Sequence, residues 1–279
     1  MGLQRLCAKA SLSVARRWRR FGCFVLVGLS LAQASSLAQS TPDAVPEANP
    51  ARPTVSTPAT LTPVGYLQFE TGAFFAQTSP EFSSVANINE VTKLAVHPRL
   101  QFILEFNPVA GATGEINDTD FGGLSVGFQS VLLGTGDANT TLAISYLHEA
   151  VGSPVPDTDI GTPTNSGILL LSTNAANFHF DIDGIFNQQT VGNDSRTQYG
   201  QTLSIAHPLW KLTGQAEIWL FTQPFLHSDA VGLLWAVSYS ARNNLVFDAG
   251  FEHGLTNSST QWEEFFGFTY LLPHRLWKR

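Results

Sequence analysis

The chain has 279 residues, among them 15 Lys and Arg against 22 Asp and Glu, which gives a net charge of −7. This acidic balance argues against nucleic-acid binding, which requires a basic footprint on the protein.

The first 38 residues predict a secretory signal peptide. Four arginines, at positions 16, 17, 19 and 20, precede the apolar run FGCFVLVGLSLAQA (residues 21–34), and small residues follow at Ser36 and Ala38. A basic region, a short apolar run and an A-x-A-like site are typical of export signals. The run is shorter than the roughly 20 residues of a membrane-spanning helix. We expect cleavage after Ala38, with Ala34 as the alternative.

Removal of this signal would change the charge and the redox chemistry of the chain. Both cysteines, Cys7 and Cys23, lie within it, so the mature chain would offer no disulfide and no thiolate metal ligand. Six basic residues would leave with it, so that nine basic and 22 acidic residues remain, a net charge of −13. We expect no metal, no cofactor and no nucleic-acid partner.

Residues 39–63 form a leader of unusual composition, QSTPDAVPEANPARPTVSTPATLTP. The segment is rich in Pro, Ala, Thr and Ser and has no aromatic residue, so it can bury too little apolar area to offset its ordering entropy. We expect a disordered or polyproline-like leader, a folded domain over residues 64–272, and a short C-terminal tail at 273–279.

The folded domain shows a period of two, and no long helical periodicity. In NLVFDAGFEHGL (244–255), for example, apolar residues alternate with polar or small ones, which is typical of a strand with one apolar and one polar face. Twelve strands are predicted in this way, over residues 65–76, 85–96, 99–107, 121–132, 140–148, 165–172, 178–187, 196–206, 211–221, 230–240, 244–254 and 261–272.

The connections between these strands alternate in length. Those after the even strands are short, such as HP (97–98) and ARN (241–243), whereas those after the odd strands are mostly longer and polar, such as NPVAGATGEINDTD (107–120). An even strand number with short turns at one rim and long loops at the other is the plan of an outer-membrane barrel.

A soluble sandwich or barrel is the alternative, since many exported proteins are also rich in strands. Three features favour the membrane barrel. Most strands have the length that crosses a bilayer with tilt, the apolar faces are large and aromatic (Phe102, Leu104 and Phe106, for example), and the opposite faces are small and polar, as at Gly200, Thr202 and Ser204. We therefore predict an all-β fold, an antiparallel up-and-down transmembrane β-barrel of about 12 strands in the outer membrane of a Gram-negative-type cell.

A family resemblance points the same way. The stretch VGLLWAVSYSARNNLVFDAGFEHGLTNSSTQWEEFFGFTYLL (231–272) resembles the end of the transporter-like outer-membrane barrels of the meta-pathway of phenol degradation type. The shared features are an apolar strand that carries Asp248, a GL pair before a polar loop, and a last strand with Gly267 among aromatics. More loosely, the resemblance extends over residues 64–272. It implies passage of small hydrophobic or aromatic solutes. As a membrane barrel, the protein is also expected to have outer-membrane lipid and the barrel-insertion machinery as partners.

Strand alternation predicts which charged side chains face the lumen. The inward set is Glu70, Lys93, Arg99, Glu105, Asp181, Asp183, Glu217, Asp248 and Glu252. Seven acids against two bases predict a negative interior that favours cations or neutral solutes. In the alternative interpretation, these carboxylates pair with Lys93 and Arg99 or with Thr, Ser and Gln, and they simply fill a barrel narrower than a porin.

The sequence therefore predicts a barrel for passage or binding of small hydrophobic or aromatic solutes. One alternative is a closed structural barrel that binds a partner. A less favoured one is a lipid-modifying enzyme, for which the candidates are His148 with Ser145, and His179 with Asp181. Ser145 and His148 are expected on opposite faces, and His179 has no obvious serine partner, so we predict no catalytic residues.

Overall fold

The computed structural model describes residues 45–114, 117–135, 138–153, 163–191, 194–224 and 228–277. The predicted signal peptide and residues 39–44 of the leader lie outside this part of the chain. No helix within it has the length and apolar character needed to span a bilayer.

The described chain is built from antiparallel strands. Their bounds are β1 Leu67–Gln77, β2 Ser84–His97, β3 Leu100–Thr113, β4 Asp118–Asp120, β5 Leu124–Leu133, β6 Thr140–Val151, β7 Pro163–Ala175, β8 Phe178–Val191, β9 Asp194–Leu209, β10 Leu212–Phe221, β11 Ala230–Arg242, β12 Leu245–Gly254 and β13 Trp262–Leu271. Twelve of them correspond to the predicted strands. The short β4 was not predicted, because its three residues, DTD, carry no alternation of apolar and polar side chains.

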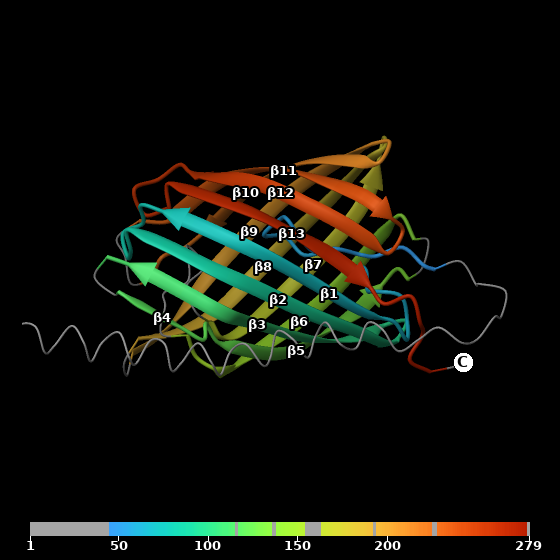
Figure 1. The fold of residues 1–279 in the computed structure, drawn as a ribbon, viewed down its shortest axis with the longest axis horizontal. Coiled ribbons are helices and arrows are strands. Elements are labelled where there is room, and N and C mark those ends of the chain that lie inside the picture. Colours follow the sequence, from blue (N-terminus) through green and yellow to red (C-terminus); the bar gives the residue numbers. More distant parts are fainter. Residues whose placement is uncertain are drawn as a thin grey trace, which may run out of the picture. The chain divides into compact units, whose positions relative to one another are not determined.

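The twelve long strands close into a barrel. Each pairs with its neighbour in sequence, β3 pairs with β5, and β1 pairs with β13, from Gln68 opposite Leu271 to Gln77 opposite Trp262. The β4 strand adds only to β3, outside the closed ring. The prediction of an antiparallel twelve-stranded transmembrane barrel is confirmed. In Figure 1 the strands in front slope in one direction and those behind slope in the other, as in a barrel of tilted strands.

The two rims differ as the connections predict. At the short-turn end, residues 98–99, 176–177, 210–211 and 243–244 join strands by two residues, and residues 134–139 make the fifth turn. At the long-loop end, connections reach eleven residues, at 152–162. One pair departs from the expectation: β8 and β9 are joined by residues 192–193 alone, because both strands continue beyond their predicted ends.

Side chains alternate between an apolar outer face and a polar inner face. In β12, Phe247 and Phe251 are 45% and 46% exposed, whereas Asp248 and Glu252 are 6% and 4% exposed. The same outer face continues around the barrel through Phe75, Phe102, Val126, Ile144, Leu169, Ile182, Phe186, Leu203, Ile218, Trp235, Phe266 and Phe268. Such a continuous apolar belt is what lipid requires, and it leaves the carboxylates inside the barrel.

The leader departs from its prediction. Residues 39–63 are predicted to be a disordered or polyproline-like leader outside the folded domain, but the structure places residues 45–63 inside the barrel, where they form no strand and lie against the inner faces of the strands (Figure 1, blue). Ala59 and Ser56 are completely buried. The ordered domain therefore includes residues 45–63 and does not begin near Val64. The physical reason is that partners for this segment come from the barrel wall and not from the segment itself.

The C-terminal tail also has fixed contacts. Leu276 N donates to Gly65 O at 2.8 Å, and the Arg275 guanidinium donates through Nε to Val64 O at 3.0 Å. The tail thus holds the segment that enters β1 at the short-turn end.

Candidate functional site: a lumen closed by residues 45–63

Of the nine charged residues predicted to face the lumen, the structure places eight on the inner face. Seven are buried, namely Glu70, Lys93, Asp181, Asp183, Glu217, Asp248 and Glu252, and Glu105 is half-buried and lines an internal cavity. Glu263 is a further buried carboxylate on the inner face, and it was not among the predicted residues. Its neighbour Glu264 is exposed on the outer face of the same strand, as the period of two requires.

Arg99 is the exception. It lies in the two-residue turn between β2 and β3, is exposed, and donates through Nη1 to Leu132 O at 2.9 Å. The predicted third strand begins one residue too early. Arg99 belongs to the turn, where the alternation of inward and outward side chains does not hold. Arg99 therefore pairs with none of the lumen carboxylates, and the single basic wall residue buried among them in the described chain is Lys93.

Residues 45–63, which we call the plug, fold into a loop with a closed neck. Asn49 Nδ2 donates to Thr60 O at 2.9 Å, so the two ends of the segment 50–59 meet. Both ends lie near the short turns: Ala48 N donates to Asn243 O between β11 and β12, and Thr62 N donates to Gln101 Oε1 at the start of β3. The plug therefore enters the barrel from the short-turn end, turns inside it and returns.

Wall carboxylates hold the turn of the plug through its backbone. Glu217 of β10 accepts from Val55 N at 2.8 Å with one oxygen, and from Ser56 N and Ser56 Oγ, both at 2.7 Å, with the other. Asp183 of β8 accepts from Thr57 N at 2.7 Å. Glu217 thus accepts three hydrogen bonds from the plug and Asp183 accepts one, so β10 and β8 fix the deepest part of the plug.

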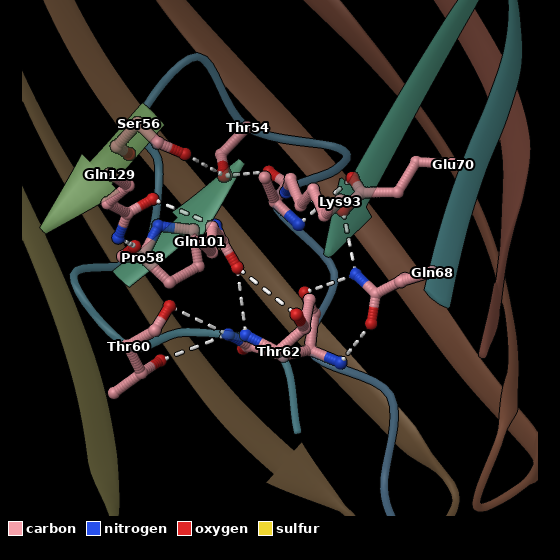
Figure 2. A network of polar contacts seen from close by, with 12 residues as sticks. Thr54, Ser56, Pro58, Thr60, Thr62, Gln68, Glu70, Lys93, Gln101 and Gln129 are labelled. Atoms are coloured by element: carbon pink, nitrogen blue, oxygen red, sulfur yellow. Dashed lines mark hydrogen bonds and ion pairs between the residues drawn. The ribbon is translucent and has the colours of Figure 1, made fainter. Parts of the chain in front are cut away.

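Side-chain amides and hydroxyls hold the returning arm. Ser172 Oγ accepts from Ala59 N at 2.7 Å and donates to Asp181. Gln101 and Gln129 form a bridge, in which Gln129 donates to Pro58 O at 2.9 Å and accepts from Gln101 (Figure 2). The prolines of the plug keep it from forming its own secondary structure, so its remaining N–H and C=O groups are available to the wall.

The entering arm meets a second polar cluster, also drawn in Figure 2. Gln68 accepts from Asn49 N and donates to Asn49 O at 2.7 Å, and Glu70 accepts from Ala51 N at 3.1 Å. Lys93 forms an ion pair with Glu70 at 2.5 Å. Lys93 therefore pairs with one of the predicted carboxylates, although it does so along the wall between the neighbouring strands β1 and β2 and not across the lumen. The same carboxylate also binds the plug.

Arg52, the one basic residue of the plug, lies against the inner wall where β1 pairs with β13. Its Nε is 3.4 Å from Asp248 Oδ1. Gly72 of β1 and Gly267 of β13 are direct cross-strand partners, and a Cβ at Gly72 would overlap the Arg52 guanidinium. Two glycines thus provide the room that an arginine needs to lie flat against the wall.

Apolar contacts complete the fit. Val55 packs against a buried cluster inside the barrel that contains Ile185, Trp219, Phe221 and Ala230. Ala59 packs with Val131, Ala143 and Leu170. The inner face therefore carries two apolar patches at the positions where the plug presents apolar side chains.

An internal cavity of about 430 Å³ lies above the plug. Its floor is made of plug residues, including Arg52 and Val55, and its walls come from the strand halves next to the long loops. We call this space the vestibule. The plug separates it from the short-turn end, since the described lumen on that side is occupied by the segment and its hydrogen bonds.

The residues considered for an enzyme do not form a catalytic arrangement. Ser145 is buried inside and bonds to Phe128 O, whereas His148 is exposed on the outer face and contacts Asn165. His179 contacts Asp181 at 3.1 Å, but Ser172 bonds to the same Asp181 oxygen and not to the imidazole, so the order of a nucleophilic triad is not met. Within the described chain, no three His, Cys, Asp or Glu side chains are grouped as a metal site.

A comparison with solved structures supports the fold. No family model and no curated protein matches the sequence. The NanC porin is similar over 73% of this chain and 98% of its own length, with a TM-score of 0.51 and 10% identity. The fold is that of a porin-like barrel. The β domain of the Bordetella autotransporter BrkA (75% and 99% covered, TM-score 0.49, 12% identity) and the KdgM porin in complex with disordered oligogalacturonate (74% and 98%, 0.48, 10%) are also similar.

Proposed function

We propose that this protein is an outer-membrane channel for small solutes, and that the plug closes it at rest. The observation that carries the proposal is that the lumen is blocked by a separate loop of the chain and not by the strands of the wall. The lumen is filled by a looped segment whose two ends meet at the short-turn end, so the loop can leave without breaking any strand pairing. A barrel with a purely structural interior needs no such separable part.

The lining supports passage of solutes with an apolar or aromatic part. Phe74 and Phe265 line the vestibule together with polar side chains. Pockets that combine apolar walls with a few polar groups are typical small-molecule sites. The solute class expected from the sequence is thus compatible with the space above the plug, and it remains part of this proposal.

An outer-membrane location is the first expectation to test. We expect the full chain to appear in the outer-membrane fraction and to run faster on a detergent gel without boiling than after boiling, because a closed barrel resists detergent. A soluble periplasmic product without a heat-dependent shift would contradict the membrane assignment.

Passage that depends on plug movement can be tested with a reversible crosslink. Ala59 N donates to Ser172 Oγ at 2.7 Å, so the plug and the wall are adjacent at this point, and cysteines at these two positions are the pair to oxidise. We expect proteoliposomes that contain the oxidised A59C/S172C variant to take up no more small solute than protein-free vesicles. Reduction should restore the uptake seen with the unmodified chain, because the plug is then free to leave.

The single A59C variant, under the same oxidation and reduction, is the control and should behave like the unmodified chain. Equal uptake by the oxidised and reduced double variant would contradict gating by the plug. If the unmodified chain and both states of the variant admit nothing, the closed structural barrel is the better account. The number of buried hydrogen bonds that hold the plug is the observation that favours this second candidate.

A further inference from the structure

The vestibule has an unbalanced set of polar groups. Among the described residues that line it, four are acidic, namely Glu105, Glu149, Glu252 and Glu263, and one is basic, Arg52. Arg52 is already paired with Asp248 below the cavity. The lining therefore has a net charge of −3, and a half-enclosed cavity with apolar walls concentrates the resulting field.

The uncharged polar lining also contains hydrogen-bond acceptors without donors. Asn187 of β8 is 1% exposed and lines the vestibule; its Nδ2 donates to Gln198 Oε1 at 3.1 Å, but its Oδ1 has no donor. Asn87 of β2 lines the same cavity and its Oδ1 likewise has no donor. Buried acceptors are satisfied in native proteins in nearly all cases, and a ligand that brings N–H groups into the vestibule would supply the donors that these two oxygens lack.

Aromatic and aliphatic side chains form the rest of the walls. Phe74 and Phe265 come from β1 and β13, and Ile168, Ile185 and Leu234 also line the cavity. Phenyl faces attract cations as well as apolar groups. A volume of about 430 Å³ is within the range of small-molecule sites.

We propose that the vestibule binds small organic cations, that is, amines with an aromatic or aliphatic body. The ammonium group takes the acceptor oxygens of Asn187 and Asn87 and the field of the carboxylates, and the body packs on the phenylalanines. This inference rests on the proposed function, since it names the solute class that would enter the channel. Binding itself needs no passage, because the site lies above the closed plug.

Three ligands of the same shape test the charge requirement: phenylethylammonium, neutral 2-phenylethanol and anionic phenylacetate. Binding to the full chain in detergent is measured by titration calorimetry. We expect the cation to bind at least about tenfold more tightly than the alcohol, which corresponds to roughly 1.4 kcal/mol, and the anion to show no binding. Equal affinity for cation and alcohol, or a preference for the anion, would overturn the proposal.

Variants locate the site. Glu263→Gln and Asn187→Leu should each weaken binding of the cation by about tenfold, and Glu263→Gln should leave binding of the alcohol unchanged. Glu264→Gln is the matched control, because this neighbouring carboxylate lies on the outer face and should have no effect. Cation binding that neither inner variant changes would place the site elsewhere and overturn the proposal.

The outcomes separate the two proposals. Cation binding without uptake in the crosslinking experiment would keep the site and refute the channel. Uptake without charge-selective binding would keep the channel and refute this solute class.

Discussion

Deletion of residues 50–59 is expected to convert the closed barrel into an open, cation-selective pore. The deletion joins Asn49 to Thr60, which are already hydrogen-bonded at 2.9 Å, so the chain needs no new path. It removes Arg52 and all the groups that bind Glu217 and Asp183. Water and counterions then occupy the space, since buried carboxylates without partners must be solvated or neutralised.

The inner face determines the selectivity of this pore. Among the described residues, the buried charged side chains are seven acids (Glu70, Asp181, Asp183, Glu217, Asp248, Glu252 and Glu263) and one base, Lys93. Planar-bilayer recordings of the variant should show steady conductance, smaller than in porins of roughly 16–18 strands, with a reversal potential in a salt gradient that indicates cations. The unmodified chain should stay mostly closed.

The deletion variant must still form the barrel, and its heat-dependent gel shift is the control for this. A variant that folds and yet conducts nothing would show that wall side chains, such as Trp219 and Phe221, close the lumen without the plug. In that case the channel function would lose its support.

The strands were predictable because two independent patterns in the sequence reflect the geometry of a membrane barrel. Alternation in β12 separates Phe247 from Asp248, and turn composition separates the two rims. The errors lie at strand ends: Arg99 was counted as a strand residue, and β8 and β9 continue to Val191 and from Asp194. Such ends are decided by pairing with a neighbour, which no local pattern contains.

The plug could not be predicted from its own composition. A segment with five prolines between residues 46 and 63 and no aromatic side chain cannot form a core by itself. Its order depends on Glu217, Asp183 and Ser172, which are more than 100 residues away in sequence. One signal was present: a narrow lumen with seven acids and few bases requires donors from elsewhere, and the leader carries many free backbone N–H groups.

Substitution of Glu217 by Gln is expected to open the channel without removing any part of the plug. Both carboxylate oxygens accept from the plug, Oε2 from Val55 N and Oε1 from Ser56 N and Oγ. In glutamine one oxygen becomes an NH₂ group, so a donor faces a donor on one side whichever way the amide lies. The side-chain volume hardly changes, and the barrel wall is therefore kept.

The size of the effect follows from the hydrogen bonds lost. A hydrogen bond to a charged group contributes roughly 1.5–3 kcal/mol, and about 1.4 kcal/mol is a factor of ten in an equilibrium, so the ratio of open to closed channels should rise by at least about tenfold. Single-channel recordings measure this ratio directly. Glu149→Gln is the matched control, since Glu149 is a vestibule carboxylate whose backbone partner is Ser153 and not the plug. If both substitutions raise the open fraction equally, the cause is the loss of negative charge from the lumen. If only Glu217→Gln raises the open fraction, the hydrogen bonds of Glu217 to Val55 and Ser56 are what keep the channel closed.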